Sequence, residues 1–487
     1  MAYKGLGDFV AAIEARGELR RVKVEVDPEL EITEIADRVM RANGPALLFE
    51  RVKGSAYPLL INAMGSEPRM ALALGAKSLD EKAAAIEELL DWAMRQARDP
   101  SILGTLPGAI PKIPALLSLM PRRVMRPPCR EIVSDSEGFA SLPVLKCWPE
   151  DGGRFLTLPI VCTRDPDSGE QNMGMYRMQV YDDRTAGMHW HIHKDGARIF
   201  SKHAARGERM PVAVALGCDP AVTYASTAPL PEGLWEMIFA GFLRGKPAAI
   251  AKASLSDIDV PADAEFVLEG YVDPAEKRLE GPFGDHTGFY SLPDDYPVFH
   301  LERLTRRKSP IYPATIVGIP PKEDCWMAKA TERLFLPFLK RLCPEISDLA
   351  MPIEGVFHNC VIVSIRKRYP GQARKVMNFI WGMGQMMYTK LIVVVDDDID
   401  LSDLSMVAWR VFNNIDASRD LALSEGPLDA LDHSSPKAGY GTRLGVDATR
   451  KLPGEGHDRP WPKSLKMDDR VTRLVDGRWK DYGIGLK

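Results

Sequence analysis

Two carboxylates lie five residues apart in a segment whose backbone is tightly constrained. The segment EGPFGDHTGFYS runs from Glu280 to Ser291 and holds Glu280, Asp285 and His286 together with three glycines and a proline. It is too broken for a helix and too acidic for an ordinary strand. It is either a surface turn or a site where rigid backbone aims an acid at a substrate.

A lone arginine lies in the apolar stretch NMGMYRMQV, residues 172–180. If MYRMQV is a strand, Met175, Arg177 and Gln179 share one face. An arginine inside a small barrel needs an anion, whereas one on a two-sided strand lies at the surface. Two carboxylates near that arginine can divide the work. One stays ionised and holds the arginine, while burial raises the pKa of the other so that it donates a proton.

The segment MHWHIHKDGAR contains three alternating histidines, His189, His191 and His193. On a strand all three would face one side, which favours a metal site or a solvated face. A basic neighbourhood suited to a phosphate follows, formed by Lys194, Arg198, Lys202 and Arg206. Glu236 lies among apolar residues in LWEMIFAG, where a carboxylate is costly unless it binds a ligand or forms a salt bridge.

Helical and strand patterns alternate in the N-terminal part of the chain. GDFVAAIEARGEL has helical spacing with Gly17 as its stop, and RRVKVEVD alternates like a strand. SLDEKAAAIEELLDWAMRQA is an amphipathic helix capped by Ser78. These patterns predict an α/β domain over residues 1–125, and a proline-rich connector spans residues 107–128.

Regular short strands predict an antiparallel sheet or barrel over residues 126–311, among them LPIVCTRD, YRMQVYDD and FHLERLTR. From residue 312 a β-α-β order returns, with ATIVGI and KLIVVVDDDID as strands and CWMAKATERLFLPFLKRL as a helix. It predicts a parallel sheet in a C-terminal α/β domain over residues 312–487, whose last forty residues form an irregular tail. The fold class is α/β (α+β) with three domains.

Composition excludes several classes of protein. The chain has 487 residues, 27% charged and 45% hydrophobic, and a net charge of −4, which does not suit a globally basic nucleic-acid binder. No apolar run is long enough for a membrane span. The seven cysteines are scattered and never in C-x-x-C spacing, as in reduced cytoplasmic proteins.

Four motifs together resemble those of the UbiD-like decarboxylases. EGPFGDHTGFYS, NMGMYRMQV, MHWHIHKDGAR and SSPKAGYGTRLGVDATRK occur in that family's order, and the similarity runs from the start of the chain to about Lys451. Members reversibly decarboxylate aromatic or α,β-unsaturated acids with prenylated FMN, a metal and potassium. The resemblance implies that the central domain is a split β-barrel that binds the flavin.

The resemblance also implies three groups of site residues. The metal ligands, for Mn²⁺ or Mg²⁺, are Asn172, His193 and Glu236. The flavin contacts are Met175, Tyr176, Arg177, His189, Trp190, His191, Lys194 and Asp195, with Arg443 near the phosphate. The catalytic residues are Arg177, Glu280 and Asp285.

These assignments imply a mechanism. Arg177 orients the substrate carboxylate, Glu280 keeps Arg177 in place, and Asp285 protonates the ring carbon. Gly281-Pro282 and Gly284 would aim the acid and let the backbone approach the flavin. An aspartate at position 285 favours a hydroxylated aromatic acid, either a hydroxybenzoate-type acid or a quinone precursor.

We expect two kinds of protein partner. No segment is assignable to prenyl transfer, so a flavin prenyltransferase should supply the cofactor. The resemblance implies a homo-oligomer, a dimer or hexamer, and the Met- and aromatic-rich helix Val376–Met387 offers it an apolar surface. We also expect residues of the C-terminal domain to shape the substrate pocket, among them NFIWGMGQMM, although such a stretch is more often core than pocket wall. The alternative function is a flavin-binding oxidoreductase on a similar split barrel, and a non-enzymatic metal- or phosphate-binding protein is more remote.

Overall fold

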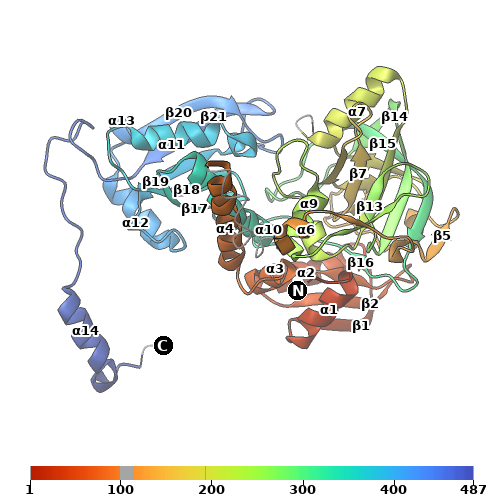
Figure 1. Ribbon diagram of the computed structural model, residues 1–487, viewed down its shortest axis with the longest axis horizontal. Helices are drawn as coiled ribbons and strands as arrows, with labels where there is room; N and C mark the ends of the chain where they lie inside the picture. Colours follow the sequence, from red (N-terminus) through yellow and green to blue (C-terminus); the bar gives the residue numbers. More distant parts are fainter. Residues whose placement is uncertain (1, 99–112, 192–193, 486–487) are drawn as a thin grey trace.

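The computed structural model describes residues 2–98, 113–191 and 194–485. An N-terminal α/β layer lies beneath a curled antiparallel sheet, and a second α/β body with a C-terminal extension lies to one side (Figure 1). None of the helices in the described ranges is long and apolar enough to cross a membrane. The mixed α/β architecture predicted from the sequence is confirmed.

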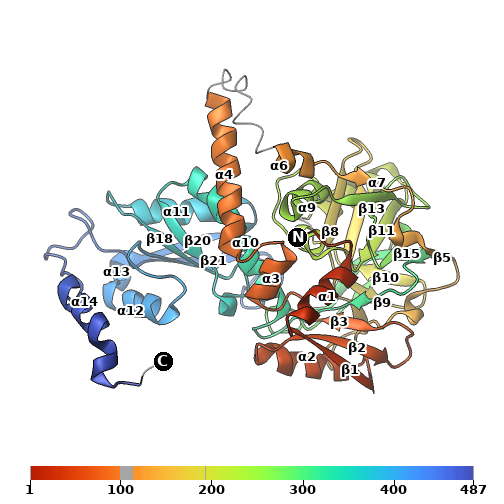
Figure 2. The same cartoon turned by 60° about the horizontal axis from the view of Figure 1, so that its bottom comes forward.

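A four-stranded sheet with helices against it forms the N-terminal layer (Figure 2). Its order is β1-β2-β3-β16, with β1 parallel to β2 and β3 antiparallel to β2. As predicted, Gly17 follows the first helix in the left-handed conformation (φ 72°), and the Ser78 hydroxyl accepts a hydrogen bond from Glu81 N (3.1 Å). The elements are α1 (Leu6–Ala15), β1 (Leu19–Val26), α2 (Glu31–Arg41), β2 (Ala46–Val52), β3 (Leu59–Ile61), α3 (Glu67–Ala73) and α4 (Leu79–Arg98).

The chain returns to this sheet after the central domain, because β16 (Tyr312–Pro313) pairs in parallel with β3. The prediction that ATIVGI is a strand of the C-terminal domain is wrong. Residues 314–319 are irregular, since the chain there leaves the edge of the N-terminal sheet to reach helix α10 (Glu323–Leu342).

The central domain is a nine-stranded sheet whose two ends come together. Its order is β6-β9-β10-β15-β14-β11-β7-β8, with β5 also paired to β15. β8 (Gln171–Met175) lies at one end and β9 (Met178–Val180) next to the other, yet only Tyr176 and Arg177 separate them. Because so short a crossing spans roughly 10 Å, the sheet has to curl into a half-barrel. The strand predicted over MYRMQV is therefore broken at Arg177.

The two longest strands, β14 (Phe266–Glu280) and β15 (Asp294–Arg306), form a hairpin in this sheet. Glu280 is the last residue of β14, and the loop 281–293 carries Asp285 and His286. The other elements of the domain are β4 (Arg122–Arg123), β5 (Ile132–Ser134), β6 (Arg154–Leu156), β7 (Ile160–Arg164), β10 (Thr185–Met188), β11 (Met210–Leu216), β12 (Ala249–Lys252), β13 (Asp259–Pro261), α6 (Ile113–Ser118), α7 (Asp195–Arg206), α8 (Pro220–Ala225) and α9 (Glu236–Arg244).

The C-terminal body is a five-stranded sheet of order β17-β18-β19-β21-β20, in which β18, β19 and β21 are parallel. Helix α11 buries Val376, Met377 and Ile380 in the core. The prediction that this helix offers an apolar surface to another copy of the chain is therefore wrong. The elements are β17 (Ile346–Ala350), β18 (Cys360–Ile365), α11 (Gln372–Trp381), β19 (Leu391–Asp396), α12 (Leu404–Asn414), α13 (Ala417–Asp420), β20 (Leu421–Pro427) and β21 (Tyr440–Asp447).

Helix α10 joins the N- and C-terminal bodies. Met327 and Leu334 pack in the N-terminal core, and Leu336 and Leu339 pack in the C-terminal core. Burial at both ends fixes the helix, and with it the position of the C-terminal sheet beside the barrel.

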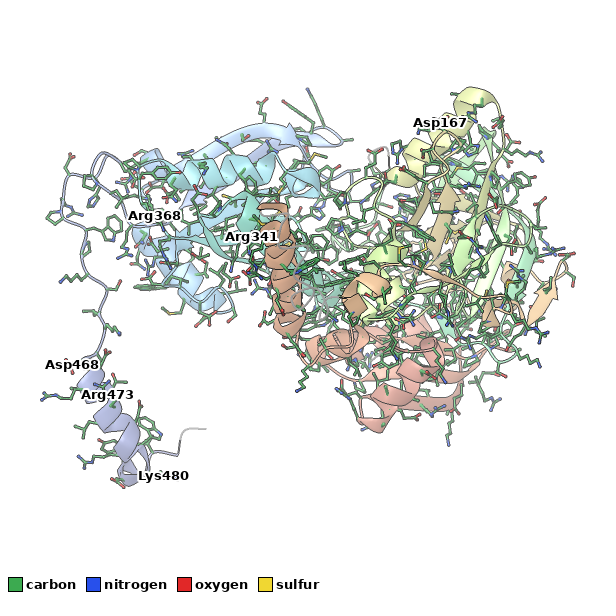
Figure 3. The ribbon with its side chains drawn as sticks, in the orientation of Figure 1. Asp167, Arg341, Arg368, Asp468, Arg473 and Lys480 are labelled. Carbon is green, nitrogen blue, oxygen red and sulfur yellow. The ribbon has the colours of Figure 1, made fainter. Side chains whose placement is uncertain are left out.

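A last helix, α14 (Asp469–Arg478), lies apart from the rest of the chain (Figure 3, labels Asp468 and Arg473). The Asp468 side chain caps it by accepting hydrogen bonds from Arg470 N and Val471 N. The prediction of a wholly irregular tail is therefore wrong over Asp469–Arg478.

Candidate active site

The β14–β15 hairpin surrounds the Arg177 guanidinium with acceptors. Arg177 Nε donates to Glu280 Oε1 (2.8 Å), and one terminal nitrogen donates to Glu280 Oε2 and Ser291 Oγ (both 3.1 Å). The other terminal nitrogen donates to Asp285 Oδ2. Arg177 Cζ also lies 4.6 Å from the centroid of the Phe283 ring. The arginine thus has the anions that its burial requires.

Glu280 has no exposed side-chain surface. Besides Arg177, its carboxylate contacts His189 Nδ1 (3.1 Å). Burial opposes ionisation, but the hydrogen bonds from His189 and Arg177 outweigh it and lower the pKa of Glu280 to about 2. Glu280 is therefore an ionised clamp on Arg177.

Asp285 divides its two oxygens between two partners. Oδ2 accepts from Arg177, while Oδ1 accepts from His286 N (2.7 Å) and lies 2.8 Å from His286 Nδ1. Burial raises the pKa of Asp285, but His286 and Arg177 outweigh it and hold that pKa well below its usual range. Burial lowers the pKa of His286, and Asp285 reverses the shift, so the His286 pKa is raised.

The expectation that one of the two carboxyls has a raised pKa is therefore wrong. Both Glu280 and Asp285 have lowered pKa values, because each accepts hydrogen bonds from Arg177 and from a histidine. The two shifts have the same consequence: the lowered pKa of Asp285 and the raised pKa of His286 both favour a proton on the imidazole rather than on the carboxylate.

Close packing fixes the hairpin loop. Gly281 N donates to Gln179 Oε1 (2.7 Å), and Gly284 N donates to Asp151 Oδ1 (2.8 Å). A Cβ atom on Gly284 would lie 2.2 Å from Cδ1 of Trp148. Gly284 therefore makes room for Trp148, whereas we expected it to admit a flavin.

A cavity of about 1570 Å³ adjoins the hairpin and lies between the barrel and the C-terminal body. Its wall is largely apolar, with a few polar groups, which is typical of sites for small molecules. Representative lining residues are Met175, Trp190, His191, Lys194, His286, Tyr296, Asp324, Phe335, His358, Met386 and Asp429.

Four of the predicted flavin contacts line this cavity: Met175, Trp190, His191 and Lys194. Tyr176 lies edge-on to Trp190, with ring centroids 6.4 Å apart.

The predicted row of histidines on one strand is wrong, because β10 ends at Met188. The rings of His189 and His191 nevertheless lie 4.5 Å apart. His193 lies outside the described residues.

Arg198, Lys202 and Arg206 do not line the cavity, so the predicted basic neighbourhood reduces to Lys194. Lys202 Nζ lies 2.6 Å from Asp165 Oδ2, Arg198 contacts the same carboxylate, and Arg206 contacts Asp167 beside α7 (Figure 3). These acids satisfy the three cations.

Asp195 and Arg443, two further predicted cofactor contacts, do not line the cavity either. Asp195 begins α7 and forms an ion pair with Arg198 (3.1 Å). Arg443 donates to Met387 O (3.0 Å) and Glu425 O (3.1 Å). The guanidinium predicted to bind phosphate is therefore hydrogen-bonded to backbone carbonyls.

Glu236, at the start of α9, lies against β8 because its Oε2 accepts a hydrogen bond from Met173 N (2.9 Å). This contact places the carboxylate beside Asn172, another predicted metal ligand. Glu236 forms no salt bridge within the described residues, and burial raises its pKa to about 8. No cluster of three or more His, Cys, Asp or Glu side chains suited to a metal occurs in the described part of the chain. Of the three predicted ligands, only Glu236 enters such a count, because Asn172 is not one of these residue types and His193 lies outside the described residues.

Models of three domains of 3-octaprenyl-4-hydroxybenzoate carboxy-lyase match the chain. The N-terminal domain matches residues 10–91, the Rift-related domain residues 122–320 and the C-terminal domain residues 325–448. The chain belongs to the UbiD family. Members of the UbiD family are carboxy-lyases, and we therefore describe the protein as one.

Individual relatives are similar to this protein over nearly the whole length of the chain. An uncharacterised protein of Archaeoglobus fulgidus is 49% identical and covers 99% of both chains. Vanillic acid decarboxylase of Sedimentibacter hydroxybenzoicus, in its closed form, is 29% identical with a TM-score of 0.87, covering 99% of this chain and 100% of the other. An evolved dimeric form of the UbiD-class enzyme HmfF from Pelotomaculum thermopropionicum, in complex with prenylated FMN, is 26% identical with a TM-score of 0.75, covering 96% and 100%.

Several residues around the cavity had no assigned role in the sequence analysis. His286 contacts Asp285 directly, and its ring stacks on Phe357 with centroids 5.0 Å apart. His358 and Asp429 approach from the C-terminal body. His286 was visible as an ionisable neighbour of Asp285, whereas nothing local marked Phe357, His358 or Asp429. The stretch NFIWGMGQMM, weighed as a possible pocket wall, does line the cavity at Met383 and Met386.

Proposed function

We propose that the UbiD-family chain is a prenylated-FMN-dependent, reversible decarboxylase of a hydroxylated aromatic acid. The single observation that carries this proposal is the arginine held between two carboxyl groups beside a large, mostly apolar cavity. An aromatic ring suits the apolar wall, and a carboxylate suits Arg177. Quinone biosynthesis and phenolic-acid metabolism are the processes in which such a reaction fits.

In this proposal the chain performs three tasks. Glu280 holds Arg177, and Arg177 orients the substrate carboxylate. An incoming carboxylate competes with Asp285 for the guanidinium, which raises the pKa of Asp285 toward its ordinary value. Asp285 then protonates the carbon that has lost CO₂. Catalysis of proton transfer by such a positioned group contributes about 10²–10⁴-fold.

The residues around the cavity fit the cofactor and a cation. Met175, Trp190 and His191 offer surface for a flavin, and Lys194 offers charge for its phosphate. Glu236 and Asn172 offer oxygen ligands to Mn²⁺ or Mg²⁺, together with His193. A buried carboxylate with a raised pKa and no ion-pair partner in the described residues supports a cation there. Prenylated FMN supplies an electrophilic centre that accepts the electrons released when CO₂ leaves. Potassium remains part of the proposal by resemblance.

We further propose that a flavin prenyltransferase supplies the cofactor and that the protein is a cytoplasmic homo-oligomer. All seven cysteines are free and six are buried, which suits a reducing compartment. Exposed apolar side chains gather on two C-terminal helices rather than on α11. On α12 they are Leu404, Met406, Trp409 and Phe412, and near α14 they are Leu465, Met467, Leu474, Trp479 and Tyr482. These surfaces support self-association.

The deciding experiment compares protein made with and without a flavin prenyltransferase, handled without oxygen and light. Hydroxylated aromatic acids, including vanillic acid and 3,4-dihydroxybenzoic acid, are screened for exchange with ¹³C-bicarbonate. We expect exchange only in the co-produced sample, with a flavin heavier than FMN by mass spectrometry. Equal exchange with plain FMN would contradict the cofactor assignment. Plain FMN with oxidation of NAD(P)H, and no exchange in either sample, would favour the oxidoreductase.

A further inference from the structure

His286 contacts the proposed proton donor but is not one of the three residues assigned to the reaction. Its Nδ1 faces Asp285 Oδ1 at 2.8 Å. Its Nε2 is buried and makes no hydrogen bond within the described residues. The side chain as a whole keeps 15% of its surface exposed and lines the cavity. One ring nitrogen is thus engaged with Asp285, and the other is unpartnered.

The surroundings of His286 favour a proton on the ring. Asp285 contacts it from the same loop, and Asp324 and Asp429 contribute negative charge from α10 and from the C-terminal body. His358, 5.8 Å away between ring centroids, is the cationic competitor, and burial lowers its pKa to about 4, so it is neutral near pH 7. Arg177 lies on the opposite side of Asp285. The acids therefore dominate around His286.

We propose that His286 is the proton relay that reloads Asp285 in each turnover. This inference rests on the proposed decarboxylase function. Each decarboxylation replaces a carbon–carboxylate bond with a carbon–hydrogen bond and consumes one proton. That proton passes from His286 Nδ1 to the Asp285 carboxylate when the substrate draws Arg177 away, and Asp285 passes it to carbon. His286 is then neutral, with its remaining proton on Nε2, and it regains the lost proton at Nδ1 from water in the cavity. His286 acts through Asp285 and not on the substrate.

The relay accounts for a difficulty in the site. Arg177 and His286 hold the pKa of Asp285 well below its usual range, which favours a carboxylate without a proton to deliver. A neighbouring imidazolium solves this, because histidine exchanges protons near neutral pH. The Asp285–His286 pair then serves as one acid, whose proton moves to the carboxylate as the substrate occupies Arg177.

The matched substitutions are His286→Asn and His300→Gln. Asparagine keeps a donor where Nδ1 faces Asp285 but relays no proton. His300 is the control because it also pairs with a carboxylate, Glu276 Oε2 at 2.6 Å from its Nε2, and does not line the cavity. Glutamine preserves a donor at that nitrogen.

The first test separates the two halves of the reaction in protein loaded with prenylated FMN. The probe is the acid that the wild type exchanges fastest, and its decarboxylated product. Exchange of ¹³C-bicarbonate into the acid needs no relayed proton, whereas uptake of deuterium by the product does. In His286→Asn we expect deuterium uptake to fall by about 10²-fold or more and bicarbonate exchange by less than about threefold. His300→Gln should change neither.

Equal loss of both exchanges in His286→Asn would mean a structural role and would overturn the relay, as would unchanged deuterium uptake. A wild type that performs neither exchange would reject the decarboxylase and the relay together. The two failures are therefore distinguishable.

A second test needs no cofactor or substrate. In protein labelled with ¹⁵N-histidine, the signal lost in His286→Asn identifies His286 among the nine histidines. We expect both of its ring nitrogens to be protonated at pH 7, and Asp285→Asn to lower the pH at which it titrates. A neutral His286 at pH 7, or a titration unaffected by Asp285→Asn, would overturn the relay.

Discussion

Replacing Glu280 with glutamine tests whether the barrel is stabilised by the ion pair at its centre. The change keeps the shape of the side chain and removes its charge at a position with no exposed surface. Arg177 and His189 then lose the carboxylate that accepts their hydrogen bonds. Breaking one side of a buried pair is destabilising because the remaining charge stays buried.

The lowered pKa of Glu280 sets the magnitude. A fall from 4.5 to about 2 corresponds to about 3 kcal/mol of folding free energy at 1.36 kcal/mol per pKa unit. For a unit the size of the central domain, that loss lowers the melting temperature by roughly 6–12 °C. Because the folded-state pKa is lowered, this stabilisation is complete above pH 4.5 and disappears as the pH falls through about 2.

The assay is thermal unfolding of the cofactor-free protein, followed by tryptophan fluorescence between pH 3 and pH 8. Glu276→Gln is the control, since Glu276 lies on the same strand and pairs with His300, but keeps 32% of its side-chain surface exposed. We expect a constant deficit for Glu280→Gln from pH 6 to pH 8, a smaller one below pH 4.5, and little change in the control. A deficit that equals the control's at pH 7, or grows below pH 4.5, would refute the reasoning.

Three further outcomes follow from the site and the C-terminal helices. Asp285→Asn should reduce decarboxylation by about 10²–10⁴-fold while the flavin still binds, and activity within threefold of wild type would contradict its role as proton donor. Glu236→Ala, like His193→Ala, should purify without flavin and without a divalent metal by elemental analysis, because the proposed metal would help to hold the flavin phosphate. The control Glu232→Ala, whose exposed carboxylate pairs with Arg198, should retain both. Full flavin occupancy in both variants after chelation would exclude this role of the metal. Removing residues 453–487 should lower the number of chains per particle, calculated from the mass found by light scattering. A monomeric full-length chain at micromolar concentration would rule out the oligomer.

Local sequence patterns predicted the elements well where the structure of a segment depends only on its neighbours along the chain. The helical spacing of residues 6–15 and the capping role of Ser78 are both found, because they depend on neighbours along the chain. The alternation around Arg177 misled, since the residue that interrupts it lies at the crossing between two strands. A crossing follows from sheet closure, which no local window contains.

The chemistry of the site depended on contacts between distant segments. Arg177 and Glu280 are 103 residues apart, and only the family resemblance suggested that they meet. The direction of the Asp285 pKa was mispredicted because two basic side chains flank the carboxylate, one of them from a distant strand end. Arg443 was misplaced for the same reason, since carbonyls of Met387 and Glu425 bind its guanidinium.

The two-residue crossing that closes the barrel also positions Arg177, so barrel closure and substrate binding should fail together. Gly174 tests this dependence without touching a reacting atom. A Cβ atom at position 174 would lie 2.4 Å from the Tyr176 ring, which packs edge-on against Trp190. Gly174→Ala therefore has to displace Tyr176 and the adjoining arginine. We expect bicarbonate exchange to fall at least tenfold in a chain that still folds. The KM for the acid should rise, while flavin occupancy changes little. Wild-type exchange in Gly174→Ala would show that the position of Arg177 is set by the hairpin alone.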